Sequence, residues 1–468
     1  MGFAGLGLLA FGAQAAVDKV SPTQSGVMVQ LGTAQVELAA ASPEILRLSV
    51  RYDSQTGPIP SSFLSQTNQA AGTGKIIEAD GWVGIKTKAG KLLLDPRTGE
   101  WTLLGTDDVT LIPKGKIGEL DHSVSAKHQQ IRIRLGWNPQ KPVAVYGCGN
   151  GVPNLVQTAA HTGVSDGGAT IPYYWSPAGY AVLAVTADDN QSASWRAAGN
   201  REAVTWTFPG SRADLYLMPA ATLQDAAKAY ARLTGFAPVP PRWTFGYLQS
   251  RWGWTNRQDV AAALDRFHEL NIPVDAFIFD FEWYTRKPDY ELADAGEAGF
   301  ADFGWNPQLF PDLREEIKEL KARDVRFVGI RKPRLGDAQL LQMVRSNRWD
   351  LRSQGYKNVP ARDLDFLNAD LREWYIKSSA GLYDAGVAAW WNDEGEATYT
   401  TYYYWNLAER AALDRYRPNA RLWTLNRAFS PGTQRFGAAA WTGDINSSWE
   451  TLAATPANLL NWSLSGMP

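Results

Sequence analysis

The sequence predicts an α/β protein with an all-β N-terminal domain: a β-sandwich at residues 18–236, followed by a (β/α)8 (TIM) barrel at residues 237–468. Three observations support this prediction. Apolar residues alternate with period two in the first half, strand and helix patterns alternate in the second, and the proline-rich segment APVPPRW (237–243) separates the two halves. The 468 residues are enough for two or three domains.

The first half contains short alternating runs that end in turn residues. ILRLSVRY (45–52) and IRIRL (131–135) are typical of strands with one buried face. In KLLLDPRTGEWTLL (91–104), the turn residues between two apolar runs predict a hairpin. Such strands, repeated along the chain, favour an antiparallel sandwich.

The second half alternates strands with helices, which is typical of parallel pairing and right-handed crossovers. Helices are predicted at 255–270 and 311–324, where apolar residues recur on one face. Six strands are predicted in the segments TFGYLQS, VDAFIFD, VRFVGI, GVAAWW, RLWTLN and AAAWTG. Because a closed barrel needs eight strands, we expect a barrel truncated after the sixth strand, with an open side and no activity on its own.

Composition excludes several classes of protein. A formal net charge of -2 gives no basic field for nucleic acid. One cysteine, Cys148, and 4 His offer neither a disulfide framework nor clustered metal ligands, so we expect no metal and no organic cofactor. The 20 Trp suit a protein that binds the C–H faces of sugars, although most of them belong in a core.

Residues 1–17 form an apolar run that ends in small residues, including Ala13 and Ala15. The pattern favours a signal peptide and a periplasmic or secreted protein, although no basic residue follows Met1. The run is too short to span a membrane. The alternative is an ordinary buried segment.

Two carboxylates far apart in the sequence follow predicted strands. Asp393, in AAWWNDEGEATYT, comes just after the fourth strand, and Asp444, in WTGDINSSWETL, comes after the sixth. The carboxyl ends of barrel strands meet at one pocket, so these side chains could face each other across a sugar. Two carboxylates are what glycosidic cleavage requires. The competing interpretation is that each aspartate caps a helix.

Eight separated segments, in order along the chain, resemble glycoside hydrolase family 31, the retaining α-glucosidase and α-xylosidase family. They are VYGCGN, TIPYYWSPAGYAVL, FGYLQSRWGW, NIPVDAFIFDFEW, FGWNPQLFPDL, AAWWNDEGE, NRAFSPGTQRF and WTGDINSSWETL. The resemblance runs from about residue 140 to the last residue and implies a carbohydrate substrate.

The resemblance also implies residue roles. Asp393 matches the family's nucleophile and Asp444 its general acid/base in the W-x-G-D motif. The other candidates contact the sugar at the cleavage point: Arg427, Asp280, Trp441, Trp391 and, from an N-terminal loop, Asp166.

Two features depart from the family pattern. Glu282 stands where the family often repeats an aspartate, which leaves open whether Asp280 or Glu282 faces the sugar. IRKPRLG places Arg331, Lys332 and Arg334 after the third strand, where solvated charge is the favoured interpretation and contact with a substituted or acidic sugar is the alternative.

The sequence therefore predicts a retaining α-glycoside hydrolase that acts on α-linked oligosaccharides or glycosides by double displacement, as an α-glucosidase or α-xylosidase. A transglycosylase of the same family, a noncatalytic carbohydrate-binding protein and another barrel glycosidase family remain alternatives. The sugar, the linkage and the oligomeric state are not specified.

Overall fold

The computed structural model describes residues 17–65, 74–121, 129–137, 144–149, 159–161, 163–165, 168–191, 193–198, 202–284, 302–354 and 360–468. Residues 1–16 of the expected signal peptide and the site candidate Asp166 lie outside the described residues. No helix in the described ranges is both long and apolar enough to cross a membrane.

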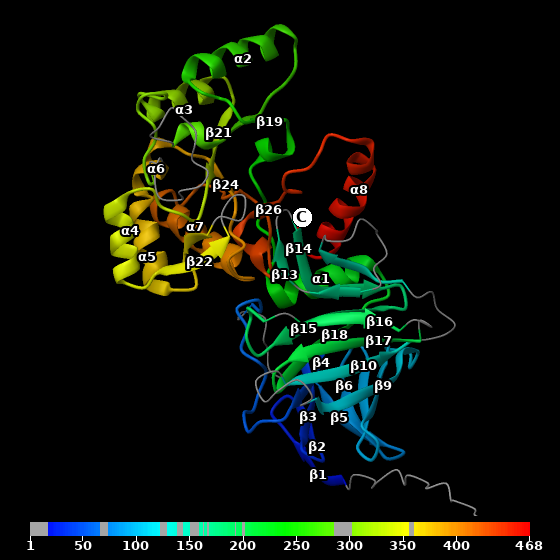
Figure 1. Cartoon of the computed structure of the whole chain (residues 1–468). Coiled ribbons are helices and arrows are strands. Elements are labelled where there is room, and N and C mark those ends of the chain that lie inside the picture. The colour runs from blue at the N-terminus through cyan, green and yellow to red at the C-terminus, as the bar shows by residue number, and fades with distance from the viewer. Residues whose placement is uncertain are drawn as a thin grey trace, which may run out of the picture.

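The N-terminal half contains two antiparallel sheets (Figure 1). The first follows the order β1 (Val17–Pro22), β2 (Gly26–Leu31), β3 (Ala34–Ser42), β4 (Ile45–Arg51), β18 (Arg212–Pro219), β15 (Tyr180–Thr186), β14 (Gly168–Ser176) and β11 (Tyr146–Gly149), with β13 (Gly163–Ser165) also on β14. The second follows the order β12 (Ala159–His161), β16 (Ser194–Ala197), β17 (Ala203–Pro209), β10 (Gln130–Gly136), β9 (Thr110–Asp121), β8 (Glu100–Leu104), β7 (Lys91–Asp95), β6 (Trp82–Lys86) and β5 (Lys75–Ala79).

Alternating side chains from both sheets form one core between them. Leu38 and Leu48 pair across β3 and β4, and both pack with Leu92 and Ile133 of the other sheet. The predicted hairpin joins β7 to β8, where Gly99 has a φ of 68° and its N–H donates to the Asp95 carbonyl at 2.9 Å. The arrangement is the sandwich that the period-two pattern predicts.

The chain leaves the sandwich through helix α1 (Leu223–Thr234), capped by Thr222, and the short 3-10 helix η2 (Arg242–Phe245). It then forms a curled sheet of parallel strands, in the order β19 (Leu248–Arg251), β20 (Ala276–Phe279), β21 (Arg326–Arg331), β24 (Ala389–Asn392), β25 (Thr424–Asn426) and β26 (Ala438–Ala440). All six predicted strands are present in sequential order. Among the described strands, β19 pairs only with β20 and β26 only with β25.

Helices connect these strands. They are α2 (Arg257–Glu269), α3 (Leu313–Ala322), α4 (Ala338–Ser346), α5 (Ala369–Ser378), α6 (Ala380–Ala385), α7 (Thr401–Tyr416) and α8 (Trp449–Leu464), with short 3-10 turns η3 (Phe281–Trp283) and η5 (Thr433–Phe436). The crossover from β21 to β24 also contains an antiparallel hairpin, β22 (Asp350–Gln354) and β23 (Pro360–Leu364), which the sequence patterns did not predict.

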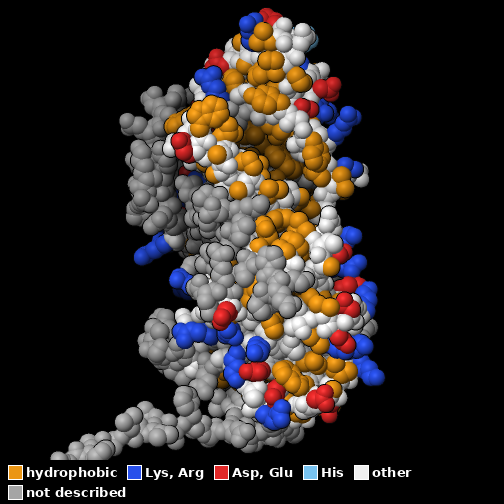
Figure 2. Space-filling model, turned by 90° about the vertical axis from the view of Figure 1, so that its right-hand side faces the viewer, with side chains coloured by type: hydrophobic (Ala, Val, Ile, Leu, Met, Phe, Trp, Pro, Cys, Tyr) orange, Lys and Arg blue, Asp and Glu red, His pale blue; other side chains and the backbone are white. Residues whose placement is uncertain are grey.

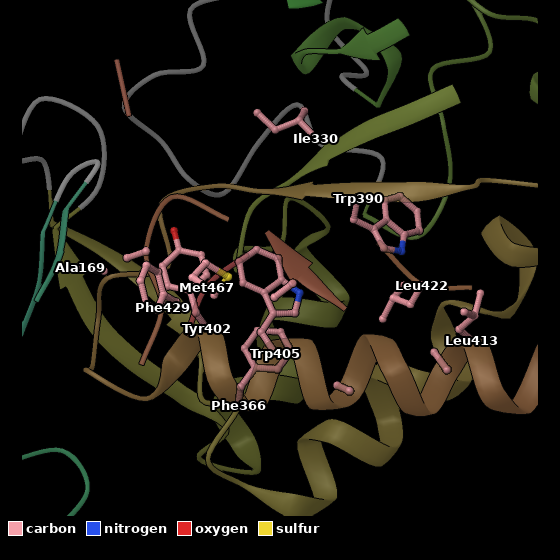
Figure 3. Packing of buried hydrophobic residues seen from close by; sticks show 14 of the residues in the cluster. Ala169, Ile330, Phe366, Trp390, Tyr402, Trp405, Leu413, Leu422, Phe429 and Met467 are labelled. Carbon is pink, nitrogen blue, oxygen red and sulfur yellow. The ribbon is translucent and has the colours of Figure 1, made fainter. Parts of the chain in front are cut away.

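The largest core cluster joins the parallel sheet, its helices and the outer face of the first sandwich sheet. Within it Phe366, Trp405 and Tyr402 form a stack, with ring centroids 5.3 Å and 6.1 Å apart (Figure 3). Helix α8 extends this contact, because the N–H of Gly149 on β11 donates to Ser465 Oγ at 2.7 Å. The two halves of the chain therefore share one hydrophobic cluster.

Candidate active site

Asp393 lies directly after β24, where the ends of three neighbouring strands are tied together. Its N–H donates to the carbonyl of Arg331 at the end of β21 (2.9 Å), and the carbonyl of Asn392 accepts from the N–H of Arg427, just past β25 (3.3 Å). The residue is 6% exposed. Backbone hydrogen bonds therefore fix the point from which the Asp393 carboxylate projects.

One cation faces each oxygen of the Asp393 carboxylate. Lys332 Nζ lies 3.1 Å from Oδ2, and Arg427 Nη1 lies 3.4 Å from Oδ1. Attraction between opposite charges is stronger in a poorly solvated pocket than in water. These two contacts fix the position of the Asp393 carboxyl group.

Glu394, the next residue, anchors the cations from the other side. Its carboxylate pairs with both Lys332 and Arg334, and Arg334 Nε also lies 2.7 Å from Asp363 Oδ1. Burial alone would raise the pKa of Glu394, but the charges of Lys332 and Arg334 outweigh it and lower that pKa. Glu394 has a φ of 53°, a left-handed backbone that is uncommon for a residue with a side chain.

The favoured interpretation of the basic run after the third strand was wrong. Arg331, Lys332 and Arg334 are only 5%, 8% and 7% exposed, so they are not solvated charges. The Arg331 guanidinium lies over the ring of Trp390, 5.0 Å from its centroid. These residues are buried because carboxylates and aromatic rings surround them.

Glu396 holds Arg427 through two hydrogen bonds of 2.8 Å and 3.1 Å. The Tyr402 hydroxyl donates to Glu396 Oε1 at 3.1 Å and accepts from the N–H of Gly395 at 2.9 Å. Burial raises the pKa of Glu396, although the charge of Arg427 opposes this effect. Since Tyr402 belongs to the aromatic stack, the core below the sheet helps to orient Arg427.

Asp280 follows β20 and its carboxylate accepts from the N–H of Phe281 at 2.8 Å. The pKa of Asp280 is raised from 3.8 to about 7, chiefly by burial; the charges of Asp393 and Glu282 contribute to the rise, whereas the Phe281 hydrogen bond and Lys332 oppose it. The pKa of Glu282 is raised by burial, although backbone hydrogen bonds and the charge of Arg251 oppose the rise. Asp280, rather than Glu282, is therefore the carboxylate coupled to Asp393 and Lys332.

Trp391 and Trp441 lie beside each other, with centroids 5.3 Å apart and an angle of 82° between their ring planes. The N–H of Trp441 donates to the carbonyl of Asn426 at the end of β25 (3.0 Å). Because β25 neighbours β24, this hydrogen bond brings Trp441 close to the end of β24. Both side chains are partly exposed. They provide the aromatic surface expected near the carboxylates.

Asp444 lies exposed in the loop between β26 and α8, on the same carboxyl-terminal side of the parallel sheet as Asp393. It does not cap the following helix, because the N-cap of α8 is Ser448. Asp393 is not a cap either, since Thr400 precedes α7. The helix-capping interpretation of both aspartates is therefore wrong.

Sequence reasoning missed three parts of this cluster: Glu394 as an anchor, Asp363 on β23 and the hydroxyl of Tyr402. Only the basic run after the third strand signalled that such partners were needed. Buried cations require nearby anions, so a buried position for Lys332 and Arg334 would have pointed to Glu394.

Comparisons with known proteins identify the family of the second half of the chain. Residues 237–468 match the TIM-barrel domain of glycosyl hydrolases family 31. An α-xylosidase of Saccharolobus solfataricus is 25% identical over 323 residues, covering 64% of this chain and 41% of that protein. A 1,6-α-glucosyltransferase of Sporosarcina globispora is 26% identical over 342 residues, covering 66% of this chain and 25% of that protein.

A solved structure has the same fold over nearly the whole chain. The family 31 α-xylosidase from a soil metagenome, in complex with xylose, superposes with a TM-score of 0.82 at 16% identity, covering 96% of this chain and 71% of that one. By contrast, the chain spans less than half the length of the α-xylosidase of Saccharolobus solfataricus and of the 1,6-α-glucosyltransferase. With a family 31 barrel at residues 237–468 and this shared architecture, the chain belongs to glycoside hydrolase family 31.

Proposed function

We propose that this chain carries the catalytic centre of a retaining α-glycosidase that acts on α-linked oligosaccharides or glycosides. The observation that supports this most is the Asp393 carboxylate, held at a strand end between Lys332 and Arg427 and next to two tryptophans. The name of one relative, the α-xylosidase of Saccharolobus solfataricus, agrees with the proposal.

In the first step, an oxygen of Asp393 attacks the anomeric carbon while Asp444 donates its proton to the departing glycosidic oxygen. In the second step, Asp444 takes a proton from water, the water oxygen bonds to the anomeric carbon, and the bond to Asp393 breaks. Two inversions give net retention. Arg427 and Lys332 stabilise the carboxylate that is consumed in the first step and regenerated in the second.

The remaining residues bind the sugar. Asp280 accepts hydrogen bonds from sugar hydroxyls when ionised, and Trp441 and Trp391 pack against the ring. Glu282 and Asp166 remain predicted contributors to sugar binding. Because Lys332 and Arg334 are already paired with carboxylates, a neutral sugar suits the pocket better than an acidic one.

A decisive experiment follows the product's anomeric configuration. With an aryl α-glucoside and an aryl α-xyloside, proton NMR should show the α-anomer first, and a fluorinated mechanism-based sugar should label the peptide that contains Asp393. Initial release of the β-anomer would overturn retention. Binding of sugars without any turnover would favour the noncatalytic alternative.

Transglycosylation is a second candidate, favoured by the similarity to the 1,6-α-glucosyltransferase. It uses the same covalent intermediate and differs only in the attacking hydroxyl. Adding a free sugar acceptor and quantifying longer oligosaccharides against released monosaccharide separates the two activities.

We further propose that the parallel sheet is part of a closed eight-stranded barrel, in which two more strands join β19 and β26. Large apolar side chains next to β19 and β26 in the sequence are exposed: Phe245 and Trp252 flank β19 and Trp449 follows β26, at 78%, 60% and 82%. Figure 2 shows hydrophobic side chains gathered around a hollow in the upper half of the face it draws. We also propose that residues 1–17 direct export to the periplasm or the medium. The sandwich is proposed to span residues 18–236 and the barrel residues 237–468.

A further inference from the structure

A cleft of about 550 Å³ lies at the amino-terminal ends of the parallel strands, the end opposite Asp393. Val325 and Arg326 line it at the start of β21, and Ala388 lines it just before β24. Pro241 and Trp243, from the segment that connects the domains, form another part of the lining. Strand β21 separates the two sites by about 17 Å, at about 3.3 Å for each residue.

The charged side chains that line this cleft are all basic. No carboxylate is among its lining residues, although the whole chain has a formal net charge of -2. The six cations are Arg314, Lys318, Lys321, Arg326, Arg417 and Arg421. So many like charges in one concavity concentrate a positive field there.

Backbone carbonyls, rather than carboxylates, hold the guanidinium groups. Arg417 Nη1 donates to the Val387 carbonyl at 2.8 Å, Arg314 Nη1 to that of Asp384 at 3.1 Å, and Arg421 Nη1 to that of Pro240 at 3.4 Å. In the described part of the chain, the one ion pair of these six cations joins Lys318 to Glu315. The guanidinium groups are therefore oriented without being neutralised.

The cleft also has an apolar part, made by Trp243, Ile317 and Phe327. The ring of Trp243 is held by an edge contact with Trp423, with centroids 5.6 Å apart. An apolar surface below a ring of cations suits a compact ligand with several negative charges better than it suits an extended polymer.

We infer that this cleft binds a small anion with at least two phosphate groups, at a site separate from the sugar pocket. Arginine forks match phosphate oxygens through paired hydrogen bonds, and several are available here at once. Free pyrophosphate and the diphosphate of a nucleotide share this chemistry. Trp243 would give the nucleotide an additional stacking surface.

Calorimetric titration of the purified protein with pyrophosphate, at about 50 mM NaCl, tests the inference. We expect a dissociation constant below about 1 mM, weakened at least tenfold in Arg326→Gln/Arg417→Gln, because charge-assisted contacts are lost. Lys318→Gln/Lys321→Gln changes only exposed side chains and should also weaken binding without affecting the unfolding temperature. Arg266→Gln/Lys377→Gln removes two exposed cations elsewhere and serves as the matched control.

Binding weaker than about 1 mM, or equal losses in the control and the cleft variants, would overturn the inference. Titration with ADP distinguishes the ligand sources. Tighter binding of ADP than of pyrophosphate, abolished by Trp243→Ala, would identify a nucleotide, and equal binding would identify the free anion. Neither ligand should compete with a sugar at the Asp393 pocket.

Discussion

The two ends of the parallel strands use charge in opposite ways. At the carboxyl-terminal end, Lys332, Arg334 and Arg427 each contact at least one of the carboxylates of Asp393, Glu394 and Glu396. At the amino-terminal end, six cations line a cleft without a carboxylate. The first arrangement orients the Asp393 carboxylate, whereas the second leaves positive charge available for a ligand. The same strands therefore support two kinds of site.

The largest effect should come from removing the Asp393 carboxylate, which lies at the carboxyl-terminal end of the parallel strands, where cations and carboxylates are paired. We call this end the paired end. In the protein whose barrel is closed by two further strands, Asp393→Ala should lower kcat by about 10⁴-fold or more, because the covalent intermediate can no longer form. Azide should partly restore turnover and give a glycosyl azide. Asp414→Ala, on the exposed side of α7, is the control, and near-normal activity of Asp393→Ala would contradict the proposed role.

Glu394→Gln tests whether pairing at this end positions the nucleophile. The substitution leaves Lys332 and Arg334 buried with one anion fewer, so the free energy of unfolding should fall by about 3 kcal/mol or more. We expect kcat to fall about tenfold or more while KM changes little, because the change affects the orientation of Asp393.

The control for that variant is Glu373→Gln, which removes an exposed carboxylate that also contacts two cations, Lys377 and Arg415. Its unfolding midpoint and kcat should match those of the unchanged protein, because solvent screens exposed pairs. Equal effects of the two substitutions would show that burial of the Glu394 cluster has no special importance.

Asp280 makes the paired end sensitive to pH. Its pKa rises from 3.8 to about 7 on folding, so between these values the folded protein binds more protons than the unfolded chain. Its contribution to stability is therefore present below about pH 4 and is lost as the pH rises to about 7. Urea unfolding at pH 5 and pH 8 should show a smaller pH dependence in Asp280→Asn, and an unchanged pH dependence would contradict the shift.

Salt should have the smallest effect, and it should affect ligand binding at the cleft more than turnover at Asp393. Raising NaCl from about 50 mM to about 500 mM should weaken pyrophosphate binding at the cleft about tenfold, because exposed charges are screened. The value of kcat should change less than about twofold, since the pairs around Asp393 are buried. Equal salt sensitivity of binding and turnover would remove the distinction between the two ends.

The sequence was sufficient to predict the six parallel strands, because strand and helix periods are local properties of the chain. All six parallel strands and the β7–β8 hairpin lie where the pattern predicts them. Helix ends depend on single side chains rather than on period: Asn256 caps α2, since its side chain accepts from the N–H of Asp259. The β22–β23 hairpin was missed because its polar strands, DLRSQ and PARDL, lack a clear alternation.

The site was harder to predict, because its contacts join distant segments. Lys332 and Glu394 are 62 positions apart, and nothing in either local pattern shows that they meet. Asp393, Asp280 and Arg427 were proposed as site residues because they follow predicted strands or match a family motif, and their roles stay predictions. Whether Asp393 and Asp444 act together remains a prediction.

The left-handed backbone of Glu394 has a consequence for how this family varies. Glycine or asparagine would adopt that conformation with less strain, so drift should favour them wherever a charged side chain is not required. Glutamate should persist only in lineages that keep basic residues at positions 332 and 334. We therefore expect the three positions to change together among homologues, and a lineage that loses the two cations should soon replace the glutamate.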